Sequence, residues 1–185
     1  MAGWVDRLRY HELSRQGLGL LLLPLSAWLA QPGNFRILAG LAIAAVGQIW
    51  RIYAAGVIYK NQQLATTGAY SLVRHPLYLG NFLILAGFCL ASGNLVILVA
   101  ATIFLVFYYP AAIRYEDHKL ERIFSNDWRA WSSRTPAMFP RHFNWLSNPT
   151  AKWNARQSLK RNGELAISIY LVGCAAWLLH RSGVV

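Results

Sequence analysis

The first stretch of the sequence that could do chemistry is TTGAYSLVRHPLYLGN, residues 66–81, which lies between apolar segments. Proline is favoured as the first residue of a helix, so Pro76 predicts a helix start with His75 at its N-cap. Helix starts bind anions, Arg74 adds a positive charge, and Gly80 would let a ligand approach the backbone. The N–H groups expected to be free at this helix start belong to Leu77, Tyr78 and Leu79. Two interpretations are open: an anion site, or a basic pair that anchors a helix at the lipid headgroups.

The second stretch holds the adjacent acids Glu116 and Asp117, two of only seven acidic residues in the chain. Neighbouring residues of a helix point in different directions, so at most one of the two acids is expected to face a site, while the other faces nearby arginines. The alternative is a pair of membrane-edge acids that Arg114 or Arg122 neutralises. An acid opposite an anion site would suit a zwitterionic ligand.

Apolar segments must position these residues. Of the 185 residues, 56% are hydrophobic and 14% are charged, whereas a soluble domain has about a quarter charged residues. A helix needs roughly 20 apolar residues to cross a bilayer. The candidate spans are residues 18–31, 35–59, 77–92, 95–113 and 165–179. The sequence therefore predicts an all-α, polytopic membrane protein with about five transmembrane helices.

The spans at residues 77–92 and 95–113 are joined by the short turn Ser92-Gly93-Asn94. Helices joined by so short a turn form an antiparallel hairpin, whose two open ends are neighbours. We therefore expect His75 and Glu116 to share one site, although they are far apart in sequence.

Basic residues predict which side of the membrane this site faces. Residues 114–161 hold ten of the eighteen lysines and arginines, and the turn at residues 92–94 holds none. Because basic loops remain in the cytoplasm, the N-terminus and the site are expected on the cytoplasmic side of a bacterial inner membrane or an ER-type membrane. The same rule accounts for the net charge of +11, so no nucleic-acid partner is expected. Cys89 and Cys174 lie in apolar spans, which indicates neither a disulfide nor a metal site.

A basic segment precedes the last span. Its basic residues recur at four-residue spacing beside an apolar stripe: Lys152, Arg156 and Lys160, with Ala151, Ala155 and Leu159, and Trp153 nearby. If helical, the segment could lie along an anionic lipid surface. The alternative is an element that contacts the substrate.

Three motifs follow one another along the chain: LATTGAYSLVRHPLYLG at residues 64–80, RYED at 114–117 and FSNDWRAWSSRTPAMFP at 124–140. Together, over roughly residues 48–140, they resemble the integral-membrane methyltransferases of the isoprenylcysteine carboxyl methyltransferase family and their phospholipid methyltransferase relatives. The resemblance implies an enzyme that uses S-adenosylmethionine to methylate a lipophilic, membrane-borne acceptor.

The resemblance implies a cofactor site between the hairpin ends. The carboxylate of S-adenosylmethionine would lie near the His75 helix start. Glu116 and Asp117 match the family's paired glutamates, which contact polar groups of the cofactor, and Pro136 begins the segment that wraps the adenosine. The expected cofactor-binding residues are His75, Leu77, Tyr78, Glu116, Asp117, Pro136 and Met138.

The resemblance also implies a site for the methyl acceptor. Arg74 and Arg134 match family arginines that orient the acceptor, and arginine is suited to holding a carboxylate or phosphate. Arg51 matches a further recurrent arginine; as a charge within a span it is either functional or paired. We expect one membrane domain over residues 1–185. Its parts are the first two spans (17–59), the cofactor-binding hairpin and cytoplasmic cap (64–140), a basic interfacial segment (141–162) and the last span (163–180).

The sequence departs from the family at several positions. Asp117 replaces a glutamate, and Ser125 and Met138 stand where the family has glycine. Residues 144–185 carry no family motif that we recognise.

Methyl transfer from a sulfonium is an in-line displacement, so the enzyme mainly positions the partners and excludes water. His75 is accordingly expected to cap the helix and contact the ligand rather than to act as a base. An isoprenylcysteine-like carboxylate would suit the arginines, and a phospholipid amine would suit the acids. The competing functions are an NADPH-dependent membrane reductase related to the sterol reductases, which have about twice as many spans, and a noncatalytic membrane protein that keeps the fold. The sequence predicts no oligomeric state.

Overall fold

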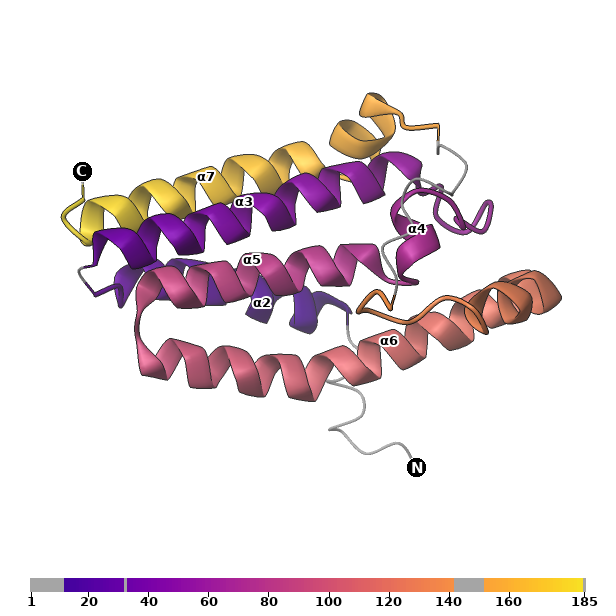
Figure 1. Ribbon diagram of the computed structural model, residues 1–185, viewed down its shortest axis with the longest axis horizontal. Helices are drawn as coiled ribbons and strands as arrows, with labels where there is room; N and C mark the ends of the chain where they lie inside the picture. Colours follow the sequence, from indigo (N-terminus) through magenta and orange to yellow (C-terminus); the bar gives the residue numbers. More distant parts are fainter. Residues whose placement is uncertain (1–11, 32, 142–151, 185) are drawn as a thin grey trace. The chain divides into compact units, whose positions relative to one another are not determined.

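A computed structural model describes residues 12–31, 33–141 and 152–184 of the chain (Figure 1). The regular elements among these residues are all helical, which agrees with the predicted all-α class. In order, they are α2 (Glu12–Trp28), α3 (Asn34–Val57), α4 (Ala69–Leu72), α5 (Pro76–Ser92), α6 (Leu95–Ser132), the π-helix η2 (Gln157–Arg161) and α7 (Glu164–Arg181). Among the described residues, α3, α6 and α7 are long and apolar enough to cross a membrane, while α5 and the apolar part of α2 are shorter. Several apolar helices thus indicate an integral membrane protein, and the count of five spans stays a prediction.

The helix α6 differs most from the sequence prediction. It was expected to end near residue 113, but it continues to Ser132. Its polar second half, residues 114–132, holds three arginines and two glutamates, which favour a helix. At Ser125 the backbone is not helical (φ 43°, ψ −111°), so α6 is kinked there. Much of the predicted cytoplasmic cap is therefore a continuation of the same helix.

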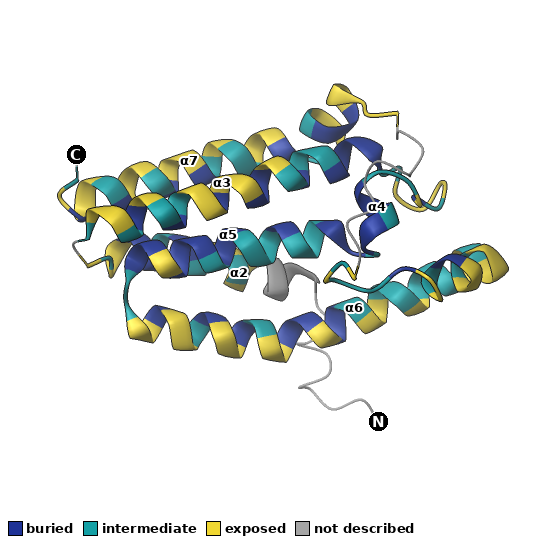
Figure 2. Ribbon diagram, viewed as in Figure 1, coloured by how far each residue is buried: buried dark blue, intermediate teal, exposed yellow. Residues whose placement is uncertain are grey.

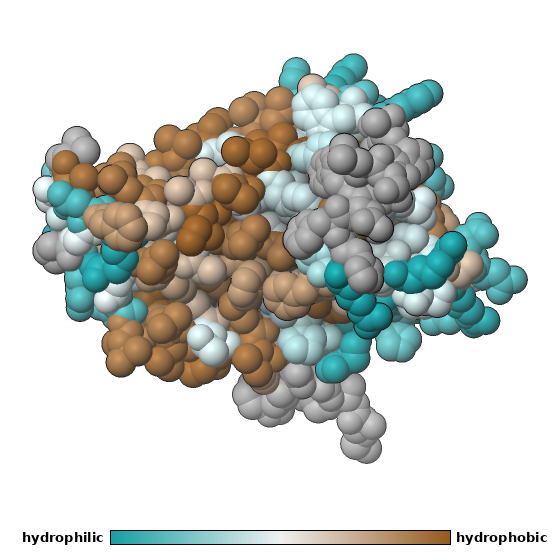
Figure 3. Space-filling model, viewed as in Figure 1, coloured by the Kyte–Doolittle hydropathy of each residue, from teal (hydrophilic) through white to brown (hydrophobic). Residues whose placement is uncertain are grey.

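The chain folds into two compact units, and α3, α5, α6 and α7 each contribute residues to both. Unit 1 comprises Met1–Val46, Phe82–Ala112 and Ile169–Val185, and unit 2 comprises Gly47–Asn81 and Ile113–Ser168. Most of the large hydrophobic side chains that are exposed belong to unit 1, and Figure 3 shows hydrophobic residues over most of this unit on the face drawn. So large an apolar surface is typical of contact with lipid.

In unit 1, α3 and α5 pack at close range. Gly40 and Ala44 lie one turn apart on α3, as Gly87 and Ala91 do on α5. A Cβ added to Gly40 would lie 2.6 Å from the Ala91 nitrogen, and one added to Gly87 would lie 2.6 Å from the Ala44 nitrogen. Pairs of small residues at this spacing let the backbones of membrane helices approach each other. The helix α5 is buried accordingly, with Leu90 as its one exposed residue (Figure 2).

A short turn joins α5 to α6 in unit 1. Gly93 adopts a positive φ of 59°, and the Asn94 side chain accepts a hydrogen bond from the Val96 N–H (2.9 Å), which caps α6.

An apolar cavity of about 290 Å³ lies between leucines of α2 and residues of α6 that include Phe104 and Phe107.

Unit 2 has its own hydrophobic core. It joins the end of α3, the short helix α4 and the end of α6. The buried members are Ala54, Val57, Ala65, Ala69, Tyr70 and Trp131. The Trp131 indole donates a hydrogen bond to the Tyr70 carbonyl (3.3 Å), which fixes α4 against α6.

The segment before α7 caps the end of α3. Carbonyl groups in the last turn of a helix lack partners within it. The Asn162 side chain donates to the Ala55 carbonyl (2.7 Å), while the Ser158 hydroxyl and the Trp153 indole donate to the Ile52 carbonyl (2.7 and 3.2 Å). These hydrogen bonds hold residues 153–162 against the end of α3.

The basic residues of this segment do not take part in the docking. Lys152, Arg156 and Lys160 are exposed, whereas Gln157 and Ser158 are buried. Residues 142–151 of the predicted interfacial segment (141–162) lie outside the described residues. Contact with an anionic lipid surface stays a prediction.

Candidate functional site

Polar residues from both predicted stretches meet in unit 2 at the start of α5. This helix begins at Pro76, as the sequence predicts, and His75 precedes it as the N-cap residue. The His75 carbonyl accepts hydrogen bonds from the N–H groups of Tyr78 (3.1 Å) and Leu79 (3.2 Å). The prediction of free N–H groups is therefore wrong at these two residues, because the first turn of the helix uses them.

Asp117 binds both basic residues that precede α5. Arg74 Nη2 donates to Asp117 Oδ2 (2.8 Å) and Arg74 Nε to Oδ1 (3.3 Å), while His75 Nε2 lies 2.9 Å from Oδ1. The bidentate contact with Arg74 is both strong and directional. The predicted anion site is thus filled by a carboxylate of the chain itself. The sequence predicted that one of the two acids would face an arginine. Asp117 does so, and its partner is Arg74 rather than Arg114 or Arg122.

The surroundings of Asp117 keep it ionised. Burial alone would raise the pKa of the Asp117 carboxyl, but the hydrogen bonds and charges of His75 and Arg74 outweigh burial and hold this pKa below its usual value. An ionised carboxylate can only accept hydrogen bonds, so His75 Nε2 must carry the proton in this contact. A protonated Nε2 cannot itself accept a proton, and the expected role of His75 as a cap rather than a base stays a prediction.

The segment after α6 is tied to the same turn. The backbone N–H groups of Arg74 and His75 donate to the carbonyl groups of Pro136 (2.8 Å) and Ala137 (2.9 Å). Pro136 and Met138, which the family resemblance assigns to the adenosine, are both half-buried. The structure thus brings this segment to the start of α5, as a shared cofactor site would require.

The Arg74 guanidinium has little capacity left for a ligand. Of its five N–H donors, two bind Asp117, and Nη1 donates to the carbonyl groups of Ser132 (3.2 Å) and Thr135 (2.9 Å). The group also lies 5.9 Å from the centre of the Trp128 ring, within the range of a cation–π contact. These contacts leave the Arg74 guanidinium one N–H group for a ligand, and its contact with an acceptor stays a prediction.

Several polar groups of unit 2 have no hydrogen-bond partner among the described residues, and three of them lie in the predicted motifs. Within the described part of the chain, the half-buried Glu116 has no ion pair or hydrogen bond, and the buried Tyr70 hydroxyl and Trp128 indole N–H have no hydrogen-bond partner. Burial raises the pKa of Tyr70, and the charge of Glu116 adds to the increase. An unsatisfied buried group costs about 1–3 kcal/mol, so native structures usually provide a partner. A ligand with hydrogen-bond acceptors and a positive charge would satisfy all three groups.

The remaining predicted residues have different surroundings. Leu77 packs on the hydrophobic core of unit 2, and the Tyr78 ring meets the His75 ring edge-on, with 5.5 Å between the ring centres. Arg134 is exposed just beyond the end of α6, and its Nε donates to the Ala130 carbonyl (3.2 Å) of that helix. Contact between Arg134 and an acceptor stays a prediction.

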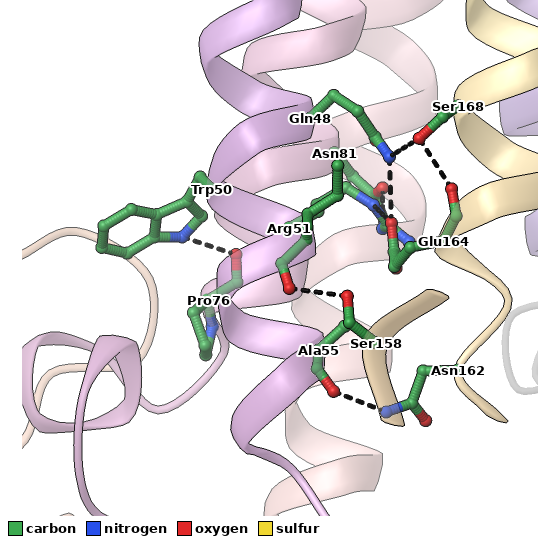
Figure 4. A network of polar contacts seen from close by, with 11 residues as sticks. Gln48, Trp50, Arg51, Ala55, Pro76, Asn81, Ser158, Asn162, Glu164 and Ser168 are labelled. Carbon is green, nitrogen blue, oxygen red and sulfur yellow. Dashed lines mark hydrogen bonds and ion pairs between the residues drawn. The ribbon is translucent and has the colours of Figure 1, made fainter. Parts of the chain in front are cut away.

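A second polar cluster in unit 2 contains Glu164, which the motif analysis missed (Figure 4). Arg51 Nη2 lies 2.6 Å from Glu164 Oε1, and Arg51 Nε lies 3.2 Å from Oε2. Gln48 donates to Glu164 (3.2 Å), and Arg51 Nη1 donates to the Asn81 side chain. Arg51 is 8% exposed and Glu164 is 1% exposed. A search for an acid at the edge of another span, as partner for a charge within a span, could have found Glu164.

This second cluster also explains Gly80. A Cβ added to Gly80 would collide with the Arg51 side chain and lie 2.9 Å from the Gly47 carbonyl oxygen. The predicted close approach at Gly80 therefore occurs, but it is made by α3 rather than by a ligand.

Comparisons with known proteins agree with the motifs. Two similar proteins are the nickel-cobalt-cadmium resistance protein NccN of Alcaligenes xylosoxydans xylosoxydans (36% identity over 135 residues) and the cobalt-zinc-cadmium resistance protein CzcN of Cupriavidus metallidurans (34% over 152 residues). The matches cover 72% and 78% of the chain, but only 61% and 67% of the two relatives. Within the described ranges, no three His, Cys, Asp or Glu side chains form a group that could hold a metal ion. No solved structure matches the chain.

The family comparison concerns the region that contains the hairpin. The family model for phospholipid methyltransferase matches residues 35–127, about half of the sequence. This range includes the start of α5 and the adjacent acids Glu116 and Asp117 of α6. The chain therefore belongs to the phospholipid methyltransferase family.

Proposed function

We propose that the chain is an S-adenosylmethionine-dependent methyltransferase that acts on a lipophilic, membrane-borne acceptor. The observation that carries the proposal is the Arg74–His75–Asp117 cluster at the start of α5, next to Glu116, which has no partner among the residues that the structure describes. Membership of a methyltransferase family supports the reaction class. The proposal includes five spans, a cytoplasmic N-terminus and a site in unit 2 that faces the cytoplasm.

The residues of unit 2 fit S-adenosylmethionine. Glu116 would hold its cationic groups, and the orphaned donors of Tyr70 and Trp128 would bind its oxygen or nitrogen acceptors. Pro136 and Met138 would line the adenosine. When bound, the cofactor would supply a methyl group on a positively charged sulfur.

The chain itself would position the reactants and exclude water. Asp117 holds Arg74 and His75, and through them it ties α6 and the segment after α6 to the start of α5. Glu116 is adjacent to Asp117 on α6, so the same contacts fix the backbone from which its side chain extends. Arg134, exposed and basic, would bind the polar end of the acceptor. A carboxylate acceptor would suit Arg134, and an amine acceptor would suit Glu116.

Metal resistance is a second candidate function, because both relatives carry that description. Deletion of the gene, followed by growth on nickel, cobalt, zinc and cadmium salts, would test it. Unchanged growth on all four salts would contradict it.

Calorimetric titration of the purified protein in nanodiscs tests the methyltransferase proposal. We expect the protein to bind S-adenosylmethionine and not NADPH, which separates the proposal from a reductase and from a noncatalytic protein. Binding of NADPH alone, or of neither, would contradict it. Methyl incorporation into a total lipid extract would then identify the acceptor class.

A substitution assigns the cofactor contact. Glu116→Ala should weaken cofactor binding about tenfold or more, which corresponds to about 1.4 kcal/mol. Glu121→Ala is the matched control, because Glu121 is an acid of the same helix that pairs with an exposed arginine. Unchanged binding by Glu116→Ala would remove Glu116 from the cofactor site.

A further inference from the structure

The family match ends at residue 127, yet the segment that leads into α7 contacts the elements that hold the site. Figure 4 shows the side chains of Glu164 of α7 and Asn81 of α5 meeting the guanidinium of Arg51 of α3. Three helices therefore meet at one arginine.

The position of Glu164 is set independently of Arg51. Trp153 lies over Gly56, where a Cβ would collide with the indole ring. Ser158 and Asn162 donate to carbonyl groups of α3 (2.7 Å each). These contacts dock residues 153–162 on α3 and so bring the start of α7, where a carboxylate is favoured by the helix dipole, to Arg51.

Arg51 in turn holds the start of α5. With Nε and Nη2 engaged by Glu164, Nη1 is directed at the Asn81 side chain. The aliphatic part of Arg51 fills the space beside Gly80. The neighbouring Trp50 donates from its indole to the Pro76 carbonyl (3.0 Å). Two consecutive residues of α3 thus fix the first two turns of α5, the helix that His75 caps.

We propose that Glu164 is a positioning residue of the methyl-transfer site. It orients Arg51, Arg51 clamps α5 at Asn81, and the clamped helix presents His75 to Asp117. This inference rests on the proposed function, and it makes the region after the family match a working part of the site.

The competing explanation is that Glu164 only neutralises a buried cation. The two explanations differ when both charges are removed. Replacing a buried ion pair by apolar residues of similar size is often neutral for stability, whereas removing one partner is strongly destabilising. If the pair only neutralises charge, a double apolar variant should be stable and fully active. If the pair positions α5, the same variant should be stable but defective.

The experiment compares wild type with the Arg51→Met/Glu164→Leu double variant in nanodiscs. We expect similar melting temperatures, faster hydrogen exchange at the amides of residues 78–81 by about tenfold or more, and a fall in kcat/KM of up to about a hundredfold, as for a misplaced reacting group. Ser168→Ala is the control, because it removes hydrogen bonds to Gln48 (2.9 Å) and to the Glu164 carbonyl (2.7 Å) in the same cluster and leaves the Glu164 carboxylate paired with Arg51. We expect it to match wild type in all three measurements.

A second variant guards against loss of folding in the first. Asn81→Leu breaks the clamp from the α5 side and leaves Arg51 paired with Glu164. It should show the same exchange and the same loss of activity, and combining it with the double variant should add little.

Unchanged exchange and activity in either folded variant would overturn the proposal. Faster exchange with full activity would also overturn it, because the clamp would then be irrelevant to the reaction. If wild type shows no methyl transfer, the proposed function fails. In that case the hydrogen-exchange data still test whether Glu164 and Arg51 hold the start of α5. The failure of the proposed function and the failure of this inference are therefore distinguishable.

Discussion

Replacement of Asp117 by asparagine should destabilise the chain although it preserves the side-chain shape. Arg74 and His75 both donate to Asp117, and the Asp117 side chain is only 16% exposed. Asparagine offers one accepting oxygen and one donating NH₂, so at least one contact becomes donor against donor. Hydrogen bonds to charged groups contribute about 1.5–3 kcal/mol each. Allowing for partial exposure, we expect a loss of about 2–4 kcal/mol, or on the order of 10 °C in Tm.

The pH dependence of this effect has a definite sign. The pKa of Asp117 is lower in the folded chain than its usual value. Its contribution to stability is therefore complete above the unfolded pKa of about 4 and is lost as the pH falls through the folded pKa. The difference in Tm between wild type and Asp117→Asn should accordingly be constant near neutral pH and shrink below about pH 4.

Thermal melts followed by circular dichroism between pH 7 and pH 3 measure both quantities. Glu121→Gln is the control, because Glu121 contacts Arg129 at 2.7 Å but the two side chains are 34% and 67% exposed. Such surface pairs contribute less than about 1 kcal/mol. An equal loss of Tm in both variants, or a difference for Asp117→Asn that does not change with pH, would refute the reasoning.

Three further predictions concern backbone strain, helix packing and the acceptor. Ser125→Gly should raise the free energy of unfolding by about 1 kcal/mol, because glycine adopts its φ and ψ without strain; a lower Tm would contradict this. Gly87→Val should lower it by about 1–3 kcal/mol by forcing α5 away from the Gly40 backbone, whereas Leu90→Val, at an exposed position of α5, should have little effect; equal melts would refute the close packing. Arg134→Ala should preserve the Tm and cofactor binding and lower kcat/KM for the acceptor, and an unchanged kcat/KM would exclude its contact with the acceptor.

Features with local signals could be predicted from the sequence. Pro76 marked the start of α5, and the turn Ser92-Gly93-Asn94 marked the hairpin. The hairpin in turn predicted that the residues before α5 and the acids of α6 would meet. For the membrane region, the structure confirms the helical class and the presence of several apolar helices. The length and composition of these helices do not fix the number of spans.

Features that depend on side-chain direction or on distant contacts could not be predicted. The pattern left open which of Glu116 and Asp117 would face Arg74, because the choice depends on the rotation of α6. The pairing of Arg51 with Glu164 joins residues 113 positions apart, and no periodicity reports such a contact. Ser125 stands where the family has glycine. The backbone at Ser125 has a positive φ, which explains why the family has glycine there.

The distance in sequence between Arg51 and Glu164 has a consequence for biogenesis. During translation, α3 leaves the ribosome as a segment with a cation whose counter-ion has not yet been made. An arginine in an inserting helix opposes partition by up to about 2.5–3.5 kcal/mol. In the proposed five-span arrangement, α3 is therefore held only weakly in the bilayer until α7 has been made. A nascent chain truncated before residue 164 should accordingly slip back from the membrane at α3 more readily than the finished protein.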